Sequence, residues 1–266
     1  MVAAPMFIVS CPEHVVAQCV SGIIGTFPAL NARPAGLLGD WLSEISERLA
    51  SFDAVAEGGR KAAPFAVNLI VHRSNSRLEE DLAQCVRHRV PLVITSLGAR
   101  EDVNQAVHAY GGIVLHDVVN DRFARKAMEK GADGLVAVAA GAGGHAGGLS
   151  PFVLVQEIRR LFEGPLLLSG AIAHGRSILA AQAAGADMAY VGSAFIAARE
   201  ANAEPAYQQS IVDSGASDIV YSSYFTGVSG NFLRSSIVSA GLDPDDLPAA
   251  SGQQLGVEAD YGKPRA

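Results

Sequence analysis

The sequence is poor in cysteine and aromatic residues, and it has neither a basic excess nor a long apolar run. Its three cysteines, Cys11, Cys19 and Cys85, form no CxxC pair, and their odd number argues against a disulfide framework. We therefore expect a reducing, cytoplasmic location. The formal net charge is −7, with Lys and Arg scattered along the chain, so we expect no nucleic-acid partner. No apolar run reaches about 18 residues and no basic segment opens the chain, so we expect neither a membrane span nor a signal peptide.

Apolar residues and glycine are abundant instead. The hydrophobic fraction is 49% and the chain holds 28 glycines, which is typical of a buried parallel sheet covered by Ala-rich helices. Short apolar runs alternate with amphipathic segments about eight times, the number that closes a (β/α)8 TIM barrel of the α/β class. The expected strands are residues 2–4, 23–26, 65–70, 92–96, 113–116, 135–138, 166–169 and 188–191. The expected helices are residues 13–21, 37–51, 77–88, 101–110, 121–130, 151–162, 175–184 and 194–200.

The pattern changes after the eighth unit. We assign residues 1–200 to the barrel and residues 201–242 to a small lid or insertion of one or two helices with a polar connection. Residues 243–266 are rich in Pro, Asp and Gly with little periodicity, which indicates a loosely ordered tail.

Two glycine-containing turns follow the seventh and eighth strands. They hold Ser169, Gly170 and Ala171, and Gly192 and Ser193. In parallel barrels this pair of strand ends often binds a phosphate through backbone N–H groups. The alternative is that these glycines only make tight turns between strand and helix.

The stretch GLVAVAAGAGGHAGG, residues 134–148, places one imidazole, His145, on a glycine loop. An imidazole titrates near neutral pH and can remove a proton from an acidic carbon, so His145 is the candidate base. Residues 141–146 nearly match a dinucleotide fingerprint. We reject that interpretation because the next helix begins only at Ser150-Pro151 and no acidic residue ends the following strand. No second ligand stands at metal spacing, so we expect no metal site.

The remaining histidines carry weaker signals. Five of them fall on helices or polar loops, where a solvated or capping role is the usual one; they are His14, His72, His88, His108 and His174. His116 closes the fifth strand, and it either lines the pocket or caps the strand. Ser96 and Asp117 also follow strands on the face where barrels do their chemistry.

Five segments together resemble the nitronate monooxygenase family, formerly called 2-nitropropane dioxygenases. They are AAPM near the start, VNL at the third strand, AGGHAGG at the sixth, LSGAI at the seventh and YVGSAFIA at the eighth. The family also includes flavin-dependent enoyl-acyl-carrier-protein reductases and an NADH:quinone reductase. The resemblance therefore implies an FMN barrel more directly than it implies one reaction.

The resemblance also implies a site. His145 matches the family's catalytic histidine, which removes the α-proton of a nitroalkane or steers the nitronate, while the flavin takes an electron from the nitronate and O2 then traps the organic radical. The residues implied in FMN binding are Ala4, Pro5, Met6, Asn68, Ile70, Gly143, Gly144, Ser169, Gly170, Ala171, Gly192 and Ser193. The implied partners are a nitronate or nitroalkane and O2, and a homodimer is left open.

The sequence departs from the family pattern at several positions. Ala171 replaces a glycine, Asp117 stands where some members have lysine, and Ala142 replaces an acidic residue. A Gly-Gln-Gly-type segment and a last helix are not found after the lid, so weaker flavin binding is expected. Two alternatives to a nitronate monooxygenase are an NAD(P)H-dependent flavin reductase of the same fold, acting on an enoyl thioester or quinone, and a catalytically silent flavin-barrel binding protein.

Overall fold

Eight parallel strands form one continuous sheet in the structure, a computed structural model that describes residues 1–247. The sheet order is β1-β9-β8-β6-β5-β4-β3-β2. The strands are β1 (Val2–Ala3), β2 (Gly25–Pro28), β3 (Phe65–Ile70), β4 (Leu92–Ser96), β5 (Ile113–Val118), β6 (Gly134–Val138), β8 (Leu166–Ser169) and β9 (Met188–Val191). Each begins or ends within two residues of its expected bounds, because a strand buried on both faces is a near-continuous apolar run.

The sheet closes into a barrel between β1 and β2. Val2 forms an isolated parallel bridge with Ile24, and the Ala3 N–H donates to the Ile24 carbonyl at 2.9 Å. The Thr26 hydroxyl, fully buried, donates to the Ala3 carbonyl at 2.6 Å across the same seam. The prediction of a TIM barrel is confirmed.

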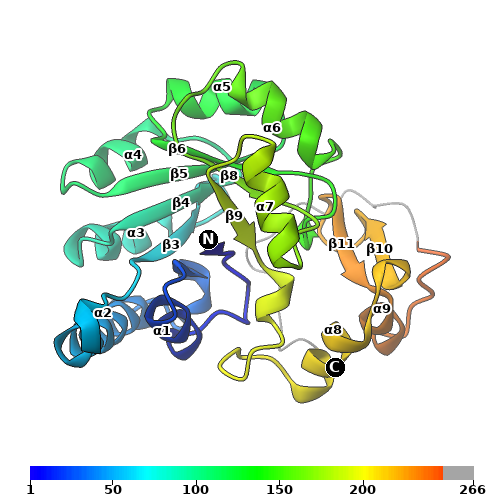
Figure 1. Ribbon diagram of the computed structural model, residues 1–266, viewed down its shortest axis with the longest axis horizontal. Helices are drawn as coiled ribbons and strands as arrows, with labels where there is room; N and C mark the ends of the chain where they lie inside the picture. The colour runs from blue at the N-terminus through cyan, green and yellow to red at the C-terminus, as the bar shows by residue number, and fades with distance from the viewer. Residues whose placement is uncertain (248–266) are drawn as a thin grey trace.

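Helices cover the outside of the barrel (Figure 1). They are α1 (Pro12–Val20), α2 (Leu37–Val55), α3 (Leu78–Arg87), α4 (Glu101–His108), α5 (Asp121–Glu129), α6 (Pro151–Arg159) and α7 (Gly175–Ala183), with 3-10 turns η1 (Ala29–Asn31) and η2 (Glu57–Gly59). Leucine and isoleucine side chains of α2 and α6 are fully buried between helix and sheet. A separate cluster fills the barrel interior; it includes Leu92, Ile94, Leu115, Val136, Leu167 and Tyr190.

The prediction of a helix over residues 194–200 is wrong. The chain instead makes a short 3-10 turn, η3 (Ser193–Phe195), followed by turns. Ile196 and Ala201 pack against Val9 from the loop after β1, and the Asn202 N–H donates to the Val9 carbonyl at 2.9 Å. These contacts hold residues 196–202 against the loop after β1.

Residues 201–242, the expected lid or insertion, contain two helices, α8 (Pro205–Asp213) and α9 (Arg234–Ser239). The connection between them is more structured than predicted: after η4 (Ala216–Asp218), strands β10 (Ile219–Ser222) and β11 (Gly230–Leu233) form an antiparallel hairpin. Strand β11 also pairs with β7 (Gly144–His145) from the glycine loop. These elements lie together at one side of the barrel (Figure 1, right).

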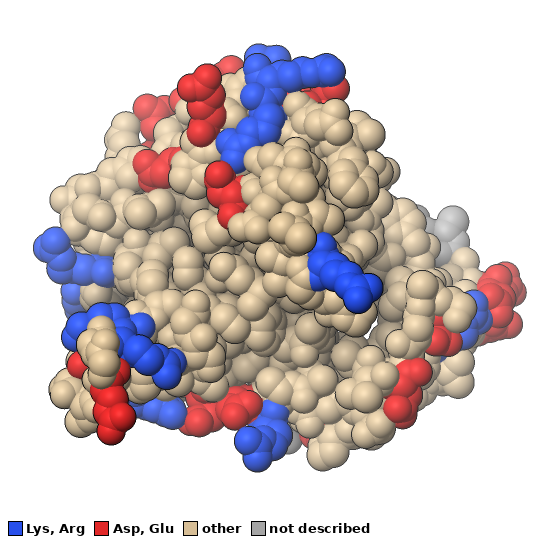
Figure 2. All heavy atoms as spheres, viewed as in Figure 1, with Lys and Arg blue, Asp and Glu red and all other residues tan. Residues whose placement is uncertain are grey.

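The structure describes only the first residues of the expected tail, residues 243–247. Residues 248–266 of the expected tail lie outside the described residues, and in the described part Arg234 pairs with Asp245 at 2.8 Å. Among residues 1–247, no helix combines the length and apolar character needed to cross a membrane. On the face shown in Figure 2, Lys and Arg side chains alternate with Asp and Glu around a largely uncharged centre.

Candidate active site

Backbone strain gathers at the carboxyl end of the barrel. Of the four non-glycine residues with positive φ among residues 1–247, three lie in loops that follow strands: Ile8 after β1, Leu97 after β4 and Ala171 after β8. Such residues persist only where their surroundings hold them, and they cluster at functional sites. The loop with Ile8 is held by Asn31, whose Oδ1 accepts the Ile8 N–H at 2.9 Å and whose amide donates to the Met6 carbonyl at 3.0 Å. No local pattern in the sequence pointed to this role of Asn31.

The loops after β1 and β9 meet at Gly192. A Cβ at this position would lie 3.4 Å from the Ala4 Cβ and 3.9 Å from the Met6 sulfur. Ala4, Met6 and Gly192, all expected at the cofactor, are therefore in one place, with Pro5 between the first two. Glycine at position 192 lets the two loops approach closely, so small groups line this part of the rim.

The glycine loop after β6 contacts the loops after β8 and β9. A Cβ at Gly143 would lie 2.4 Å from Ser193 Oγ, and one at Gly141 would lie 3.1 Å from the Ala171 Cβ. Gly170, which follows Ser169 at the end of β8, has a φ of 131° and would bring a Cβ within 2.8 Å of the Ala140 carbonyl. Gly141 and Gly170 have positive φ, which favours glycine at both positions, whereas a side chain at residue 143 would require the Ser193 hydroxyl to turn away.

One predicted phosphate donor is already in use. The Ala171 N–H donates to the Gly141 carbonyl at 3.0 Å, so within the protein it ties the two loops together. Ser193 opens η3 beside Gly143, which leaves the turn of Gly192 and Ser193 as the better placed source of backbone donors for an anion. The phosphate assignment stays a prediction.

A row of hydrogen-bonded side chains crosses three strands inside the barrel near its mouth. Asn68 on β3 donates both amide hydrogens, to the Ile94 carbonyl at 3.0 Å and to Ser96 Oγ at 2.7 Å. Ser96 on β4 donates its hydroxyl to Asp117 Oδ2 at 2.5 Å. Ile70 pairs with Ser96 in the β3–β4 register, so it lies at the same level. Because its nitrogen is committed, Asn68 could serve a ligand only through its carbonyl oxygen.

Two neighbouring residues on β5 face opposite ways. Asp117 lies in the barrel interior, and burial raises the pKa of its carboxyl to about 6, while the Ser96 hydrogen bond acts in the other direction. His116 is buried on the other face, where Nδ1 bonds Thr95 Oγ1 at 2.6 Å, and burial lowers its pKa to about 4. His116 thus neither caps the strand nor faces the mouth. His14 is also buried, bonded to Gln18 at 2.9 Å, so the expectation of a solvated or capping role is wrong for it.

His145 is anchored to the lid hairpin. Its Nε2 lies 3.1 Å from Thr226 Oγ1, and that hydroxyl donates to the Val228 carbonyl at 2.9 Å. A threonine hydroxyl has one hydrogen, so we assign the imidazole proton to Nε2, which leaves the Nδ1 lone pair for a substrate proton. The residue as a whole is exposed, but the protein around the ring partly desolvates it and lowers the pKa of the imidazole from its ordinary value. His145 is therefore neutral at pH 7.

The hairpin fixes the loop that carries His145 at three further points. Gly144 and His145 pair with Asn231 and Gly230 in the strand register. The Asn231 side chain donates to the Ala142 carbonyl at 2.7 Å, and the Ala146 N–H donates to the Ser229 carbonyl at 3.2 Å. The sequence did not single out Thr226 or Asn231, which lie more than 80 residues from the atoms they bind.

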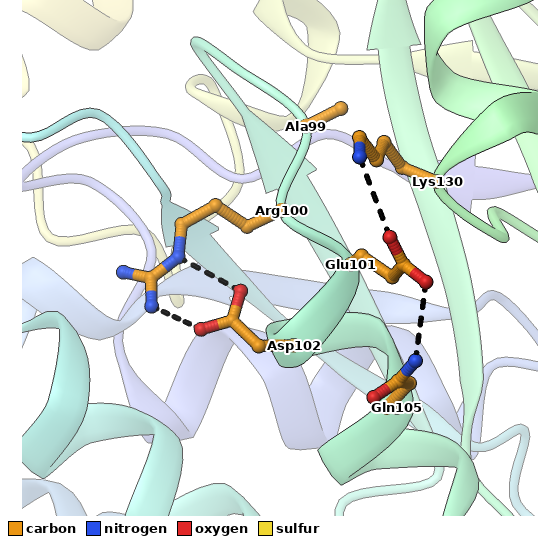
Figure 3. Close-up of a pocket in the computed structure, with 6 residues that line it drawn as sticks. All are labelled: Ala99, Arg100, Glu101, Asp102, Gln105 and Lys130. Atoms are coloured by element: carbon orange, nitrogen blue, oxygen red, sulfur yellow. Dashed lines mark hydrogen bonds and ion pairs between the residues drawn. The ribbon is translucent and has the colours of Figure 1, made fainter.

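Two hollows lie near this end of the molecule. The first, about 500 Å³, lies outside the barrel beside α4 (Figure 3), and its charges are already paired: Arg100 with Asp102 and Glu79, and Lys130 with Glu101. It resembles a solvated surface more than a ligand site. The second, about 490 Å³, is bordered by Val119, Leu149 and Val228 and adjoins Ala146, next to His145.

The nitronate monooxygenase family model matches residues 49–250, which is most of the chain. The chain belongs to this family. A relative from Mycobacterium tuberculosis, Rv1533, is 31% identical over 170 residues, 63% of this chain and 45% of its own length. The nitronate monooxygenase of Paraburkholderia phytofirmans is 27% identical over 152 residues, 54% of this chain and 42% of its own. This chain thus spans about half the length of the curated relatives it matches.

A solved structure shares the fold of this nitronate monooxygenase family member. FabK from Thermotoga maritima superimposes with a TM-score of 0.76 at 24% identity, covering 99% of this chain and 88% of FabK. The likeness supports the barrel fold. Membership of the family supports an oxidoreductase with a flavin.

The described residues fit a flavin. The approach of Gly192 to Ala4 and Met6, and of Gly143 to Ser193, offers a surface of small groups to a flat ring. The interior offers a buried carboxylate oxygen, Asp117 Oδ1, that has no hydrogen-bond partner among the described residues. Within that part of the chain, no group of His, Cys, Asp and Glu is arranged to hold a metal ion.

Proposed function

We propose that this protein is an FMN-dependent nitronate monooxygenase that oxidises nitronates, or nitroalkanes after deprotonation, with O2 to a carbonyl compound and nitrite. The observation that carries the proposal is the state of His145. It lies on a glycine loop at the barrel mouth, donates from Nε2 to Thr226 and keeps an unprotonated Nδ1. That arrangement suits abstraction of an α-proton from a neutral nitroalkane.

The mechanism assigns separate tasks to separate residues. Thr226 holds the tautomer and orientation of His145, and desolvation lowers the pKa of the imidazole, which favours the unprotonated form that can accept a proton. Asn231 and Gly230 keep the loop in place by pairing with its backbone. The apolar hollow beside Ala146 would take the alkyl part of the substrate. A bound flavin would supply the electron-accepting chemistry.

The test uses flavin-loaded protein with two forms of one substrate, a neutral nitroalkane and its preformed nitronate. The readouts are oxygen consumption and nitrite release. We expect His145→Asn to lower kcat/KM for the neutral form by about 10²-fold or more, the usual worth of a positioned base, and to affect the nitronate much less. His88→Asn, at the far end of α3, is the matched control and should change neither. Equal loss on both forms would reject His145 as the base.

The pH profile gives an independent check on the same group. The base form of His145 is needed, so kcat/KM for the neutral nitroalkane should hold at pH 7 and fall as pH drops through the lowered pKa of the imidazole. The preformed nitronate needs no base and should lack this acid limb.

The reductase alternative is separated by pyridine nucleotide. Mixing flavin-loaded protein with NADH or NADPH in the absence of oxygen should leave the flavin absorbance unchanged if the proposal holds. Loss of the flavin absorbance within seconds would contradict the proposal. It would indicate a reductase that acts on an enoyl thioester or a quinone. A protein that takes up flavin but oxidises no nitronate and bleaches with no nucleotide would be a silent binding protein.

A further inference from the structure

Asp117 is held on one side only. Oδ2 accepts the Ser96 hydroxyl at 2.5 Å, while Oδ1 is buried and has no hydrogen-bond partner among residues 1–247. A buried polar atom without a partner costs about 1–3 kcal/mol, and more when it is charged. An oxygen left in this state next to a barrel mouth is one that a ligand would satisfy.

The surroundings of Asp117 offer no cation. Ser96 and Asn68 approach from β4 and β3, Val136 is its partner on β6, and Tyr190 of β9 is the titratable group that faces it from across the interior. Burial keeps the pKa of Tyr190 well above its ordinary value, so Tyr190 is neutral.

The charged groups nearest in sequence do not change this picture. His116 faces Thr95 on the other side of the sheet, and it is neutral because burial and Lys126 lower its pKa to about 4. No Lys or Arg in the described part of the chain forms an ion pair with Asp117. The carboxyl group must therefore carry its charge uncompensated or take up a proton.

We propose that Asp117 binds the flavin in its protonated form, donating a hydrogen bond from Oδ1 to an acceptor atom of the ring system, and that its ionised form opposes binding. This inference rests on the proposed function, because it needs a flavin over the barrel mouth. The row of Asn68 and Ser96 fixes the direction: Asn68 fills an acceptor site of Ser96, so the single Ser96 proton goes to Oδ2 and leaves Oδ1 for the ligand.

Binding of the flavin should then be accompanied by uptake of one proton. The carboxyl of the free protein has a pKa of about 6, so below that pH the donor is present, and above it one proton must come from solvent for each flavin bound. The dissociation constant should then rise by up to about tenfold per pH unit above pH 6, the limit for one linked proton. Below pH 6 it should be flat.

The experiment measures this slope with riboflavin, whose ring is that of FMN but which has no phosphate to titrate. Binding is followed by quenching of flavin fluorescence from about pH 5 to pH 8.5. Asp117→Asn carries a permanent amide donor of the same shape. We expect the variant to bind riboflavin with the same dissociation constant as the wild type near pH 5. At pH 8 its dissociation constant should be lower than that of the wild type by about tenfold or more, and it should not change with pH. The exposed Asp213→Asn is the matched control and should keep the wild-type slope.

A second variant keeps the inference testable if Asp117→Asn does not fold. Ser96→Ala removes the donor that stabilises the ionised carboxyl, so the pH at which binding begins to weaken should move upward. Carboxyl NMR of the wild type should likewise show the pKa of Asp117 rising when riboflavin binds. A wild-type slope that persists in Asp117→Asn, or a break that stays in place in Ser96→Ala, would overturn the inference.

The two proposals fail in different ways. If neither FMN nor riboflavin binds at any pH, the proposed function fails and the inference with it. If flavin binds and nitronate is oxidised, but Asp117→Asn leaves the pH dependence of affinity unchanged, only the role of Asp117 is wrong.

Discussion

Ala171 has a φ of 56°, in the left-handed region where a side chain costs about 1–2 kcal/mol. Replacement by glycine removes that strain. Glycine also has more conformational freedom in the unfolded chain, which lowers the free energy of unfolding by about 0.4–1 kcal/mol. We expect Ala171→Gly to raise the free energy of unfolding in urea by up to about 1 kcal/mol. The neighbouring exposed Ala173, which has no positive φ, is the control: Ala173→Gly should lower it. Equal losses in both variants would mean that the Ala171 methyl contributes packing worth more than the strain.

Asp117 also governs the pH dependence of stability. Its pKa is about 6 in the folded protein and near 4 when unfolded, so the folded state holds the proton more tightly. Stability is therefore fullest below the unfolded pKa and declines as pH rises to about 6, by about 2–3 kcal/mol in all. Asp117→Asn should match the wild type near pH 4 and exceed it by that amount at pH 8, measured by urea unfolding without flavin. A constant gap across this range would assign the effect to packing instead of charge.

At the scale of elements, the lid hairpin places the candidate base. Gly230 lies so close to β7 that a Cβ there would be 2.6 Å from the Gly144 carbonyl. We expect Gly230→Ala to push β11 off β7, which frees the loop of His145; kcat/KM for the neutral nitroalkane should then fall at least tenfold.

The same change has a readout that does not depend on activity. The Ala146 amide, now bonded to the Ser229 carbonyl, should exchange with solvent much faster in Gly230→Ala. Gly215→Ala is the control. It lies in the same lid, but a Cβ added there would be 3.9 Å from the nearest atom, Asp218 Oδ2, so both measurements should stay unchanged. Unaltered exchange at Ala146 would show that the loop does not depend on the hairpin.

The elements differ in how far the sequence could predict them. The buried strands are apolar runs of four to six residues between turn residues, so β3, β4 and β8 were predicted at their observed bounds. The hairpin was missed because the exposed side chains Ile219 and Tyr221 blur its alternation of polar and apolar residues. The turn at residues 193–203 follows from contacts with Val9, almost 190 residues away, which no local pattern encodes.

At the scale of the whole molecule, topology made the site predictable in outline. Parallel strands bring all their carboxyl ends to one rim, so residues after β1, β3, β6, β8 and β9 had to converge. The pairings within the rim could not be predicted in the same way. His145 with Thr226, and Asp117 with Ser96, depend on which side chains face each other across loops and strands, and one side-chain hydrogen bond decides each role.

The same topology leaves one weak seam in the barrel. Strand β1 has only two residues and meets β2 through a single bridge, with Thr26 Oγ1 donating to the Ala3 carbonyl at 2.6 Å. Thr26→Val keeps the shape but removes the hydroxyl, leaving the Ala3 carbonyl without this buried donor, which costs about 1–3 kcal/mol. We expect the Ala3 and Ile24 amides to exchange faster by a matching factor while those of β4 and β5 stay protected.

The seam bears on function because Ala4, Pro5 and Met6 follow β1 directly. A loosened β1 should weaken riboflavin binding in Thr26→Val at every pH, unlike the pH-dependent change expected at Asp117. Thr26→Ser retains the hydroxyl and should keep near wild-type exchange and affinity, at a small packing cost from the lost methyl. If Thr26→Val unfolds in one step, with β4 and β5 exchanging as fast as Ala3, the seam is not a separate weak point and the barrel opens only as a whole.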